Sequence, residues 1–432
     1  MKYEEIGNEL FTLNRSNLKN LLKPGSLAVL NSNDIMPTNA DGTMPFRQNN
    51  DLLFLSGIDQ EESILLLFPN FYDPKYREIL FLKETNEHIA IWEGHKYTKE
   101  EAIETSGVST VMWLTEFEGV FNTLMAEAEF VYLNTNEHIR AASKVETRDA
   151  RFMKWCQKEY QMHKYERIAP LMHELRAVKS SREIELLQHA CTITEQGFRR
   201  VLKFIRPGVM EYEIQAEYMH EFLRNRSKGF AYEPIVASGF SACVLHYIDN
   251  NKECKDGDVL LMDVGAEYAN YNADMTRSVP VSGRFTERQR KVYDAVLRVK
   301  NEAEKILIPG NVIPEYHKEV GKIMESELLG LGLIDNTDVK NQDPNWPAYK
   351  KYFMHGTSHH LGLDVHDVGN IYQKIKPGMV FTIEPGIYIK EENLGIRLED
   401  NYVIQENGHL NMMENIPIEA EEIEELMNAV EV

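Results

Sequence analysis

The spacing of hydrophobic residues predicts a chain in which strands and helices are mixed throughout. In roughly the first 155 residues, the apolar runs SLAVL, SILLLF, REILFL and EFVYL are typical of strands, and TEFEGVFNTLMAEAE has the period of a helix. Helical periods then dominate to about residue 203. Strand signals return in IVASG, GDVLLMDVG and SVPVSG, and again near the C-terminus in GMVFTIEPGIYI. The pattern predicts an N-terminal α/β domain and a C-terminal α+β domain.

A chain of 432 residues is too long for one typical hydrophobic core, so two domains are expected. We place them at residues 1–172 and 173–432. Two helices of the second domain have predicted starts. Ser180 with Glu183, and Thr286 with Gln289, have the spacing of capping boxes ahead of long helical patterns.

Two stretches of the second domain share one pattern, Gly-x-Val-x-x-x-acid-x-Gly. They are GDVLLMDVG and GMVFTIEPG, which carry Asp263 and Glu384 at the same place. Other features recur in the same order: FIRPG and ILIPG each precede a helical pattern, and His246 and His366 precede the two acids by almost the same interval. The pattern indicates an internal duplication, in which two halves bring their acids to one centre. The alternative is chance similarity among strand and turn residues.

Asp263 lies within an apolar strand, where an unpaired carboxylate is costly. Asp274 begins the next predicted strand and Glu399 follows Glu384 across a strand–loop–strand, so each half offers two acids from one hairpin. The second half adds HGTSHHLGLDVHD, which holds four of the 14 histidines of the chain: His355, His359, His360 and His366. For any single acid, an ion pair with Arg277 or Arg397 is the simpler interpretation.

Four clustered carboxylates repel one another unless cations lie among them. With one histidine added, two divalent ions would balance the charge. Oxygen-rich ligands without thiolate favour Mn²⁺, and Co²⁺, Fe²⁺ or Zn²⁺ are compatible. Two such ions form a hydrolytic site that lowers the pKa of a bound water.

Composition limits the partners and the compartment. A net charge of −21 opposes binding to nucleic acid or to anionic membranes, and no apolar run is long enough to cross a bilayer. The four cysteines form no C-x-x-C pair. We therefore expect a reduced, cytoplasmic protein with no nucleic acid or membrane partner.

The motifs LHYIDNN, LLMDVGAEYANYNADMTRSVPVSGRFTERQRKVYDAVL, HGTSHHLGLDVHDVG, TIEPGIYI and GIRLED resemble Xaa-Pro aminopeptidase (aminopeptidase P), a relative of prolidase and methionine aminopeptidase. PFRQNNDLLFLSG resembles the N-terminal domain of the same family. The resemblance implies a C-terminal pita-bread domain with a pseudo-twofold duplication. It also implies a dinuclear metal centre that hydrolyses peptides with proline in second position, through a hydroxide that bridges the metal ions.

The resemblance implies metal ligands at Asp263, Asp274, His359, Glu384 and Glu399. Asp263 would be bidentate on one ion, Asp274 and Glu399 would bridge, and His359 and Glu384 would complete the other ion. Glu384 would also act as general acid–base.

The remaining predicted residues would contact the substrate or support the metal ligands. His246, His355 and His366 match the substrate-side histidines of the family, which stabilise the oxyanion and orient the substrate. Arg397 would support a ligand, Tyr232 would line the site, and His360 is expected to pack rather than to catalyse.

Several alternatives stay open. Prolidase, which cleaves Xaa-Pro dipeptides, uses the same five ligands. A peptide-binding pseudoenzyme would have lost ligands, and this chain keeps all of them. Methionine aminopeptidase lacks a large N-terminal domain like this one, and creatinase lacks the metal set. The short segment DVGNIYQKIKP between His366 and Glu384 leaves the preferred peptide length open. The family also implies a homodimer or homotetramer.

Overall fold

The structure is a computed structural model that describes residues 3–429. The chain divides into two compact units: residues 5–176, and residues 177–429 together with residues 3–4. The predicted domain boundary, between residues 172 and 173, falls within α7 (Ala169–Ala177), close to this division.

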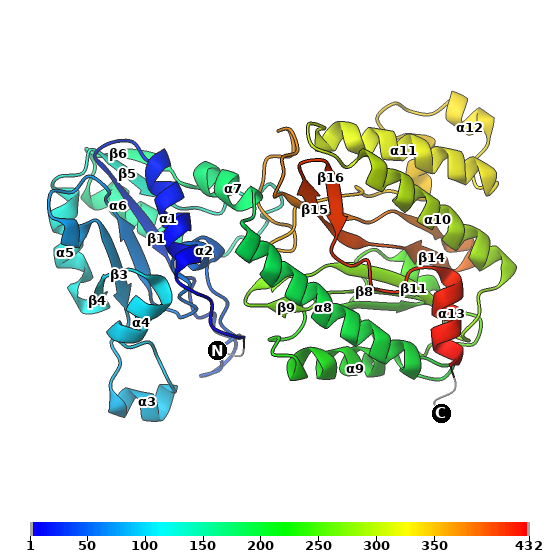
Figure 1. The fold of residues 1–432 in the computed structure, drawn as a ribbon, viewed down its shortest axis with the longest axis horizontal. Coiled ribbons are helices and arrows are strands. Elements are labelled where there is room, and N and C mark those ends of the chain that lie inside the picture. Colours follow the sequence, from blue (N-terminus) through cyan, green and yellow to red (C-terminus); the bar gives the residue numbers. More distant parts are fainter. Residues whose placement is uncertain (1–2, 430–432) are drawn as a thin grey trace. The chain divides into compact units, whose positions relative to one another are not determined.

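The N-terminal unit is built on one six-stranded sheet in the order β4-β3-β2-β1-β5-β6 (Figure 1). β1 pairs in parallel with β5 and antiparallel with β2, so the sheet is mixed. The strands are β1 Ser26–Asn31, β2 Ile64–Leu67, β3 Glu78–Leu82, β4 Thr110–Trp113, β5 Phe130–Leu133 and β6 Lys164–Arg167. The helices are α1 Glu9–Leu21, α2 Asn50–Ser56, α3 Glu87–Glu93, α4 Lys99–Ser106, α5 Phe117–Met125, α6 Arg148–Glu159 and α7.

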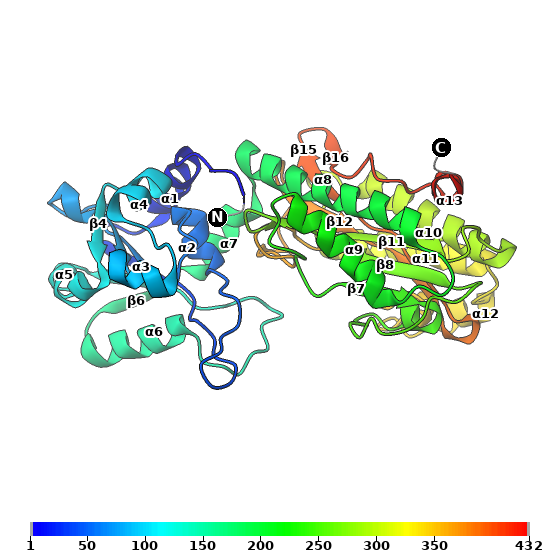
Figure 2. The same cartoon turned by 90° about the horizontal axis from the view of Figure 1, so that it is seen from below.

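Both faces of this sheet are covered, which explains why its inner strands are largely apolar runs. Every residue of β1 and β2 is buried. On one face, Phe121 of α5 and Cys156 of α6 pack with Val29 and Phe81 of the strands. Helices α1 and α2 lie on the other face (Figure 2). The predicted N-terminal α/β domain is confirmed.

The C-terminal unit repeats the order of a helix pair followed by strands. Helix α8 packs beside α9, and α10 beside α11, on the outside of the strands (Figure 1). The helices are α8 Ser181–Phe204, α9 Glu211–Arg224, α10 Glu287–Ile306, α11 Ile313–Gly330, α12 Asn336–Lys340 and α13 Ala420–Asn428. Capping boxes at Ser180 and Thr286 start α8 and α10 as predicted.

The strands of this unit form antiparallel sheets in the orders β11-β8-β7 and β12-β15-β16, with two separate hairpins, β9-β10 and β13-β14. They are β7 Ile235–Ser238, β8 Val259–Val264, β9 Glu267–Tyr268, β10 Tyr271–Asn272, β11 Met275–Pro280, β12 Val380–Ile383, β13 Gly386–Ile389, β14 Leu394–Arg397, β15 Asp400–Gln405 and β16 Gly408–Asn411. Each half of this unit thus has a pair of helices followed by paired antiparallel strands, as the predicted duplication requires.

The two halves connect their acid-bearing strands in the same way. In the first half, β9 and β10 form a small hairpin between β8 and β11, closed by Ala269 and Asn270, which both have positive φ. In the second half, the hairpin β13-β14 separates β12 from its partner β15. In each half the two acids thus lie on or beside one pair of antiparallel strands, as predicted, and the connection between those strands carries a smaller hairpin. Pro385 follows Glu384 and has no N–H for a continued ladder, so β12 ends there.

Candidate metal centre

Asp263 lies in β8, the central strand of its sheet, directly opposite Thr276 of β11. Its Oδ2 accepts a hydrogen bond of 2.6 Å from Nη2 of Arg397, which is only 4% exposed. Arg397 is the last residue of β14, so the partner of this buried acid comes from the other half. The ion pair predicted as the simpler interpretation is present, and it leaves Oδ1 of Asp263 for other partners.

The hairpin after β8 brings Asp274 back beside Asp263. Gly265 is required at this turn, because a Cβ there would lie 1.8 Å from the carbonyl oxygen of Ala273. The hydroxyl of Tyr232 lies 2.5 Å from Asp263 Oδ1 and 2.6 Å from Asp274 Oδ1. A phenol carries one hydrogen and can donate to only one of these oxygens. The carboxylates of Asp263 and Asp274 therefore lie against the same hydroxyl group, and its one hydrogen can satisfy only one of them.

His359 presents one ring nitrogen to this cluster. Its Nδ1 lies 2.9 Å from the carbonyl oxygen of His360, which can only accept, so Nδ1 carries the hydrogen. Nε2 lies 3.4 Å from Asp274 Oδ2 and 3.6 Å from Glu384 Oε1. Ligand atoms of Asp274, His359 and Glu399 all lie within 4.8 Å of one another. A carbonyl that fixes the tautomer in this way is the usual support of a metal-binding histidine.

The carboxyl groups of the cluster are short of positive charge. Burial, and then the neighbouring Asp274 and Glu384, raise the pKa of Glu399 well above its ordinary range. Burial also raises the pKa of Asp263, and it raises that of Glu384 to about 7 although His359 and Arg397 oppose the shift. Burial alone would lower the pKa of His359, but Asp274 and Glu384 outweigh it and raise that pKa. The raised pKa values mean that these groups hold protons more tightly than usual, at a place where a divalent cation would relieve the same repulsion.

The chemistry of the donors therefore fits divalent metal ions. The set offers carboxylate oxygens and one imidazole nitrogen, and it has only one permanent cation, Arg397. Two of its carboxylates, those of Asp263 and Asp274, share the one hydroxyl hydrogen of Tyr232.

The other predicted histidines surround the cluster at different depths. His355 Nε2 lies 2.8 Å from the hydroxyl of Tyr388, and its Nδ1 lies 3.6 Å from Glu384 Oε2. Burial, and then Arg397, lower the pKa of His355 to about 3, so this ring is neutral. His366 is exposed, and its ring centre lies 4.4 Å from that of His359. His246 is exposed as well. His360 is buried against Phe381, with ring centres 4.4 Å apart, as expected for a packing residue.

Two residues beside the cluster were not predicted. Thr276 Oγ1 donates to Glu399 Oε2 at 2.7 Å and accepts from Arg397 Nε at 3.1 Å. The hydroxyl of Tyr388 accepts a hydrogen bond of 2.8 Å from Arg397 Nη1. A sequence signal existed for Thr276: it lies two positions after Asp274, and side chains two apart on a strand share a face.

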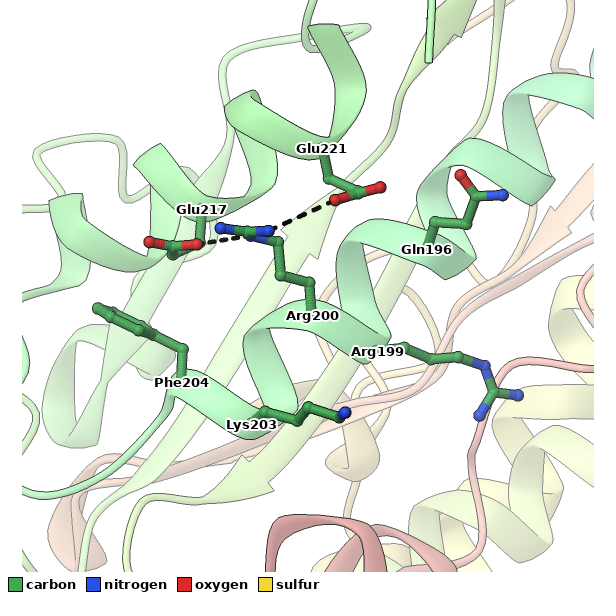
Figure 3. A pocket seen from close by; sticks show the side chains of 7 residues that line it. All are labelled: Gln196, Arg199, Arg200, Lys203, Phe204, Glu217 and Glu221. Atoms are coloured by element: carbon green, nitrogen blue, oxygen red, sulfur yellow. Dashed lines mark hydrogen bonds and ion pairs between the residues drawn. The ribbon is translucent and has the colours of Figure 1, made fainter. Parts of the chain in front are cut away.

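A pocket of about 570 Å³ lies elsewhere in this unit, between α8 and α9 (Figure 3). It contains none of the residues of the cluster. Arg200 in its wall bonds to Glu217 at 2.6 Å and lies 3.7 Å from Glu221. Arg199 bonds to Glu195 at 2.8 Å. Both arginines of this pocket are thus paired with carboxylates, which distinguishes it from the unbalanced carboxylate cluster.

Comparison with known proteins gives the family. Residues 185–406 match the model of metallopeptidase family M24, and residues 11–132 match the aminopeptidase P N-terminal domain. The chain is 35% identical to Xaa-Pro aminopeptidase of Escherichia coli (strain K12), over 98% of this chain and 99% of that one.

Solved structures of aminopeptidase P support the same family assignment. Zinc-substituted aminopeptidase P of E. coli in complex with product matches with a TM-score of 0.87 and 34% identity, over 98% of this chain and 99% of that chain. The same E. coli enzyme with the inhibitor Pro-Leu matches with the same TM-score, identity and coverage. The chain therefore belongs to metallopeptidase family M24 and, within it, to the Xaa-Pro aminopeptidases.

Proposed function

We propose that this enzyme removes the N-terminal residue from peptides with proline in second position, at the cluster formed by Asp263, Asp274, His359, Glu384 and Glu399. The observation that carries the proposal is the convergence of buried carboxylates on His359 Nε2 in a chain that matches Xaa-Pro aminopeptidases over nearly its full length. The E. coli relative was solved with Pro-Leu as an inhibitor, which supports a site that accepts proline-containing peptides.

The five residues would hold two divalent ions, with Mn²⁺ favoured and Co²⁺, Fe²⁺ or Zn²⁺ compatible. When bound, such ions polarise a peptide carbonyl and lower the pKa of a coordinated water. The carboxylate-rich donor set favours Mn²⁺ among these metals.

The side chains around the cluster have distinct proposed tasks. Glu384 would accept the proton of the attacking water and pass it to the leaving imino nitrogen of proline, because its carboxylate borders the cluster. His355 is held neutral by burial and by Arg397; its Nδ1 donates to the carbonyl oxygen of Gly356 and its Nε2 accepts from Tyr388, so the ring would orient the substrate without adding charge. His246 and His366 are exposed, which suits contact with a substrate, and the developing oxyanion is the group they would stabilise.

Arg397 and Tyr232 would hold the cluster in shape. Arg397 bonds at once to Asp263, Thr276 and the hydroxyl of Tyr388. Burial, followed by Asp263 and Asp274, raises the pKa of Tyr232 well above its ordinary range, so its phenol stays protonated and donates to one of these two acids.

The second candidate function is that of a prolidase, which would cleave only Xaa-Pro dipeptides with the same ligands. The near-complete match to Xaa-Pro aminopeptidases over both domains favours longer peptides. The test is to compare kcat/KM for an Xaa-Pro dipeptide, an Xaa-Pro tripeptide and a longer peptide, each with Mn²⁺ present. Preference for the tripeptide or longer peptide supports the proposal, and cleavage of the dipeptide alone would identify a prolidase.

We also propose a homodimer or homotetramer. Helix α3 of the N-terminal unit has no buried residue, and Ile91 and Trp92 on it are 75% and 81% exposed. A second copy of the chain would cover this apolar surface. Light scattering on the parent protein and on a Trp92→Glu variant tests this, since a monomeric parent would overturn it.

We propose a cytoplasmic location, which the reduced state of Cys156, Cys191, Cys243 and Cys254 supports, because all of them are buried and free. Among residues 3–429, no helix combines the length and the apolar character needed to cross a lipid bilayer. Fractionation of cells that produce the protein tests the location.

A further inference from the structure

Asn401 lies in β15, two positions after Glu399, and is fully buried at 0% exposed. Its side-chain amide bonds to both backbone groups of one residue in the other half. The backbone N–H of Asp274 donates to Asn401 Oδ1 at 3.0 Å, and Asn401 Nδ2 donates to the carbonyl oxygen of Asp274 at 2.6 Å. A planar amide thus takes the place of a neighbouring strand at the point where Asp274 enters β11.

A matching contact runs in the opposite direction. Thr276 lies two positions after Asp274 and is also 0% exposed. Its hydroxyl donates to Glu399 Oε2 at 2.7 Å, and its carbonyl oxygen accepts from the backbone N–H of Glu399 at 3.0 Å. The residue two positions after each acid therefore holds the acid of the other half.

We propose that Asn401 and Thr276 form a reciprocal clamp that sets the separation of Asp274 and Glu399, and through it the affinity of the centre for metal ions. Both are positioning residues, and the inference rests on the proposed ligand set. The strand segments that carry the two acids meet at a single β-bridge, Thr276 with Glu399. A shift between the halves would leave buried polar groups of the clamp without partners, which is costly. Only one separation of the acids satisfies all of them.

A neighbouring contact provides a control. The thiol of Cys191, in α8, donates to Asn401 Oδ1 over 3.5 Å, a long and weak hydrogen bond. Replacing Cys191 by Ala removes a buried group that touches Asn401 but leaves both hydrogen bonds to Asp274 in place. It therefore tests the effect of disturbed packing without loss of the clamp.

The experiment is a titration of the metal-free full-length protein with Mn²⁺, in which the electron paramagnetic resonance signal of free Mn²⁺ gives the dissociation constants. The variants are Asn401→Leu, which keeps a similar volume, Thr276→Val, which is isosteric, and Cys191→Ala. The melting temperature of each metal-free variant is measured alongside. We expect Asn401→Leu and Thr276→Val to weaken Mn²⁺ binding by about 10-fold or more. We expect Cys191→Ala to stay within about twofold of the parent.

The outcomes separate the clamp from the metal centre itself. Parental Mn²⁺ affinity in Asn401→Leu and Thr276→Val would overturn the clamp alone. If Asn401→Leu does not fold, Thr276→Val decides by the same criterion. Equal weakening in Cys191→Ala would assign the effect to packing and overturn the clamp. A parent protein that binds no Mn²⁺ would overturn the proposed centre, and the clamp with it.

Discussion

Arg397 Nη2 lies 2.6 Å from Asp263 Oδ2 and joins the last residue of β14 to the central strand of the other half. The same guanidinium bonds to Tyr388 and Thr276. One side chain therefore connects an acid of the first half to two supports of the cluster. A guanidinium fork can make these contacts together, whereas an ammonium is a single point charge.

Arg397→Lys should keep the positive charge but lose the simultaneous bonds to Asp263, Tyr388 and Thr276. We expect kcat for an Xaa-Pro tripeptide to fall by about 10- to 100-fold, as is common when the support of a metal ligand is removed. Arg288→Lys is a matched control, because Arg288 makes its two bonds to Glu392 at the surface. Equal kcat values for Arg397→Lys and the control would show that the guanidinium geometry of Arg397 has no role in turnover.

Glu384→Gln should abolish turnover and leave the fold intact. Glutamine has the same size but cannot accept a proton from water, and it is a poorer metal ligand. Glu391→Gln, at an exposed acid nearby, is the control. Steady-state kinetics and a melting curve on both variants check this, and activity of Glu384→Gln within tenfold of the parent would make Glu384 a bystander.

His246→Ala and His366→Ala should each lower kcat by about 100-fold or more while metal content and melting temperature stay close to the parent. Both histidines are exposed, so little packing is lost, and each is proposed to stabilise developing charge. His220→Ala, at an exposed histidine of α9, is the control. A large loss of metal would make either residue a ligand, and a lower melting temperature with normal kcat would make it structural.

The N-terminal unit should lose stability as the pH rises from about 4 to about 7. Asp149 accepts hydrogen bonds from the amides of Asn31 and Asn49, and burial raises its pKa from 3.8 to about 7. Between these two values the folded state binds more protons than the unfolded state, so stability falls with rising pH, by an amount on the order of a few kcal/mol.

Asp149→Asn should remove this dependence, because it keeps the shape and carries no charge. The new amide nitrogen would face the Nδ2 donor of Asn31 or Asn49, and a flip of the Asn31 amide would turn its buried, unpartnered Oδ1 toward that nitrogen. We therefore expect Asp149→Asn to have a higher urea midpoint than the parent at pH 8 and a similar midpoint at pH 5. Tryptophan fluorescence measures the unfolding. An unchanged midpoint at pH 8 would contradict the buried-carboxyl interpretation.

The strands and capped helices of both units could be predicted because their signals are local. The run GDVLLMDVG places Asp263 in a buried strand, and the next strand begins beside Asp274. Helix α2, which lies within the motif PFRQNNDLLFLSG, was not predicted. Its signals were Asn49, which caps its first turn, and Gly57, which ends it in the left-handed conformation.

The supports of the cluster were harder to predict because they join distant parts of the chain. Asn401 holds Asp274, and Tyr388 bonds to both His355 and Arg397. Such contacts depend on how the two halves meet, and no local pattern encodes that.

The most direct test of the account is to measure metal content and Xaa-Pro hydrolysis on the same sample, before and after chelation and again after Mn²⁺ is restored. The account predicts two divalent ions per chain, loss of activity with the metal, and recovery with Mn²⁺. The unbalanced charge at Asp263, Asp274 and Glu399 is the structural reason. Undiminished hydrolysis of Xaa-Pro bonds by protein with no metal above background would contradict it.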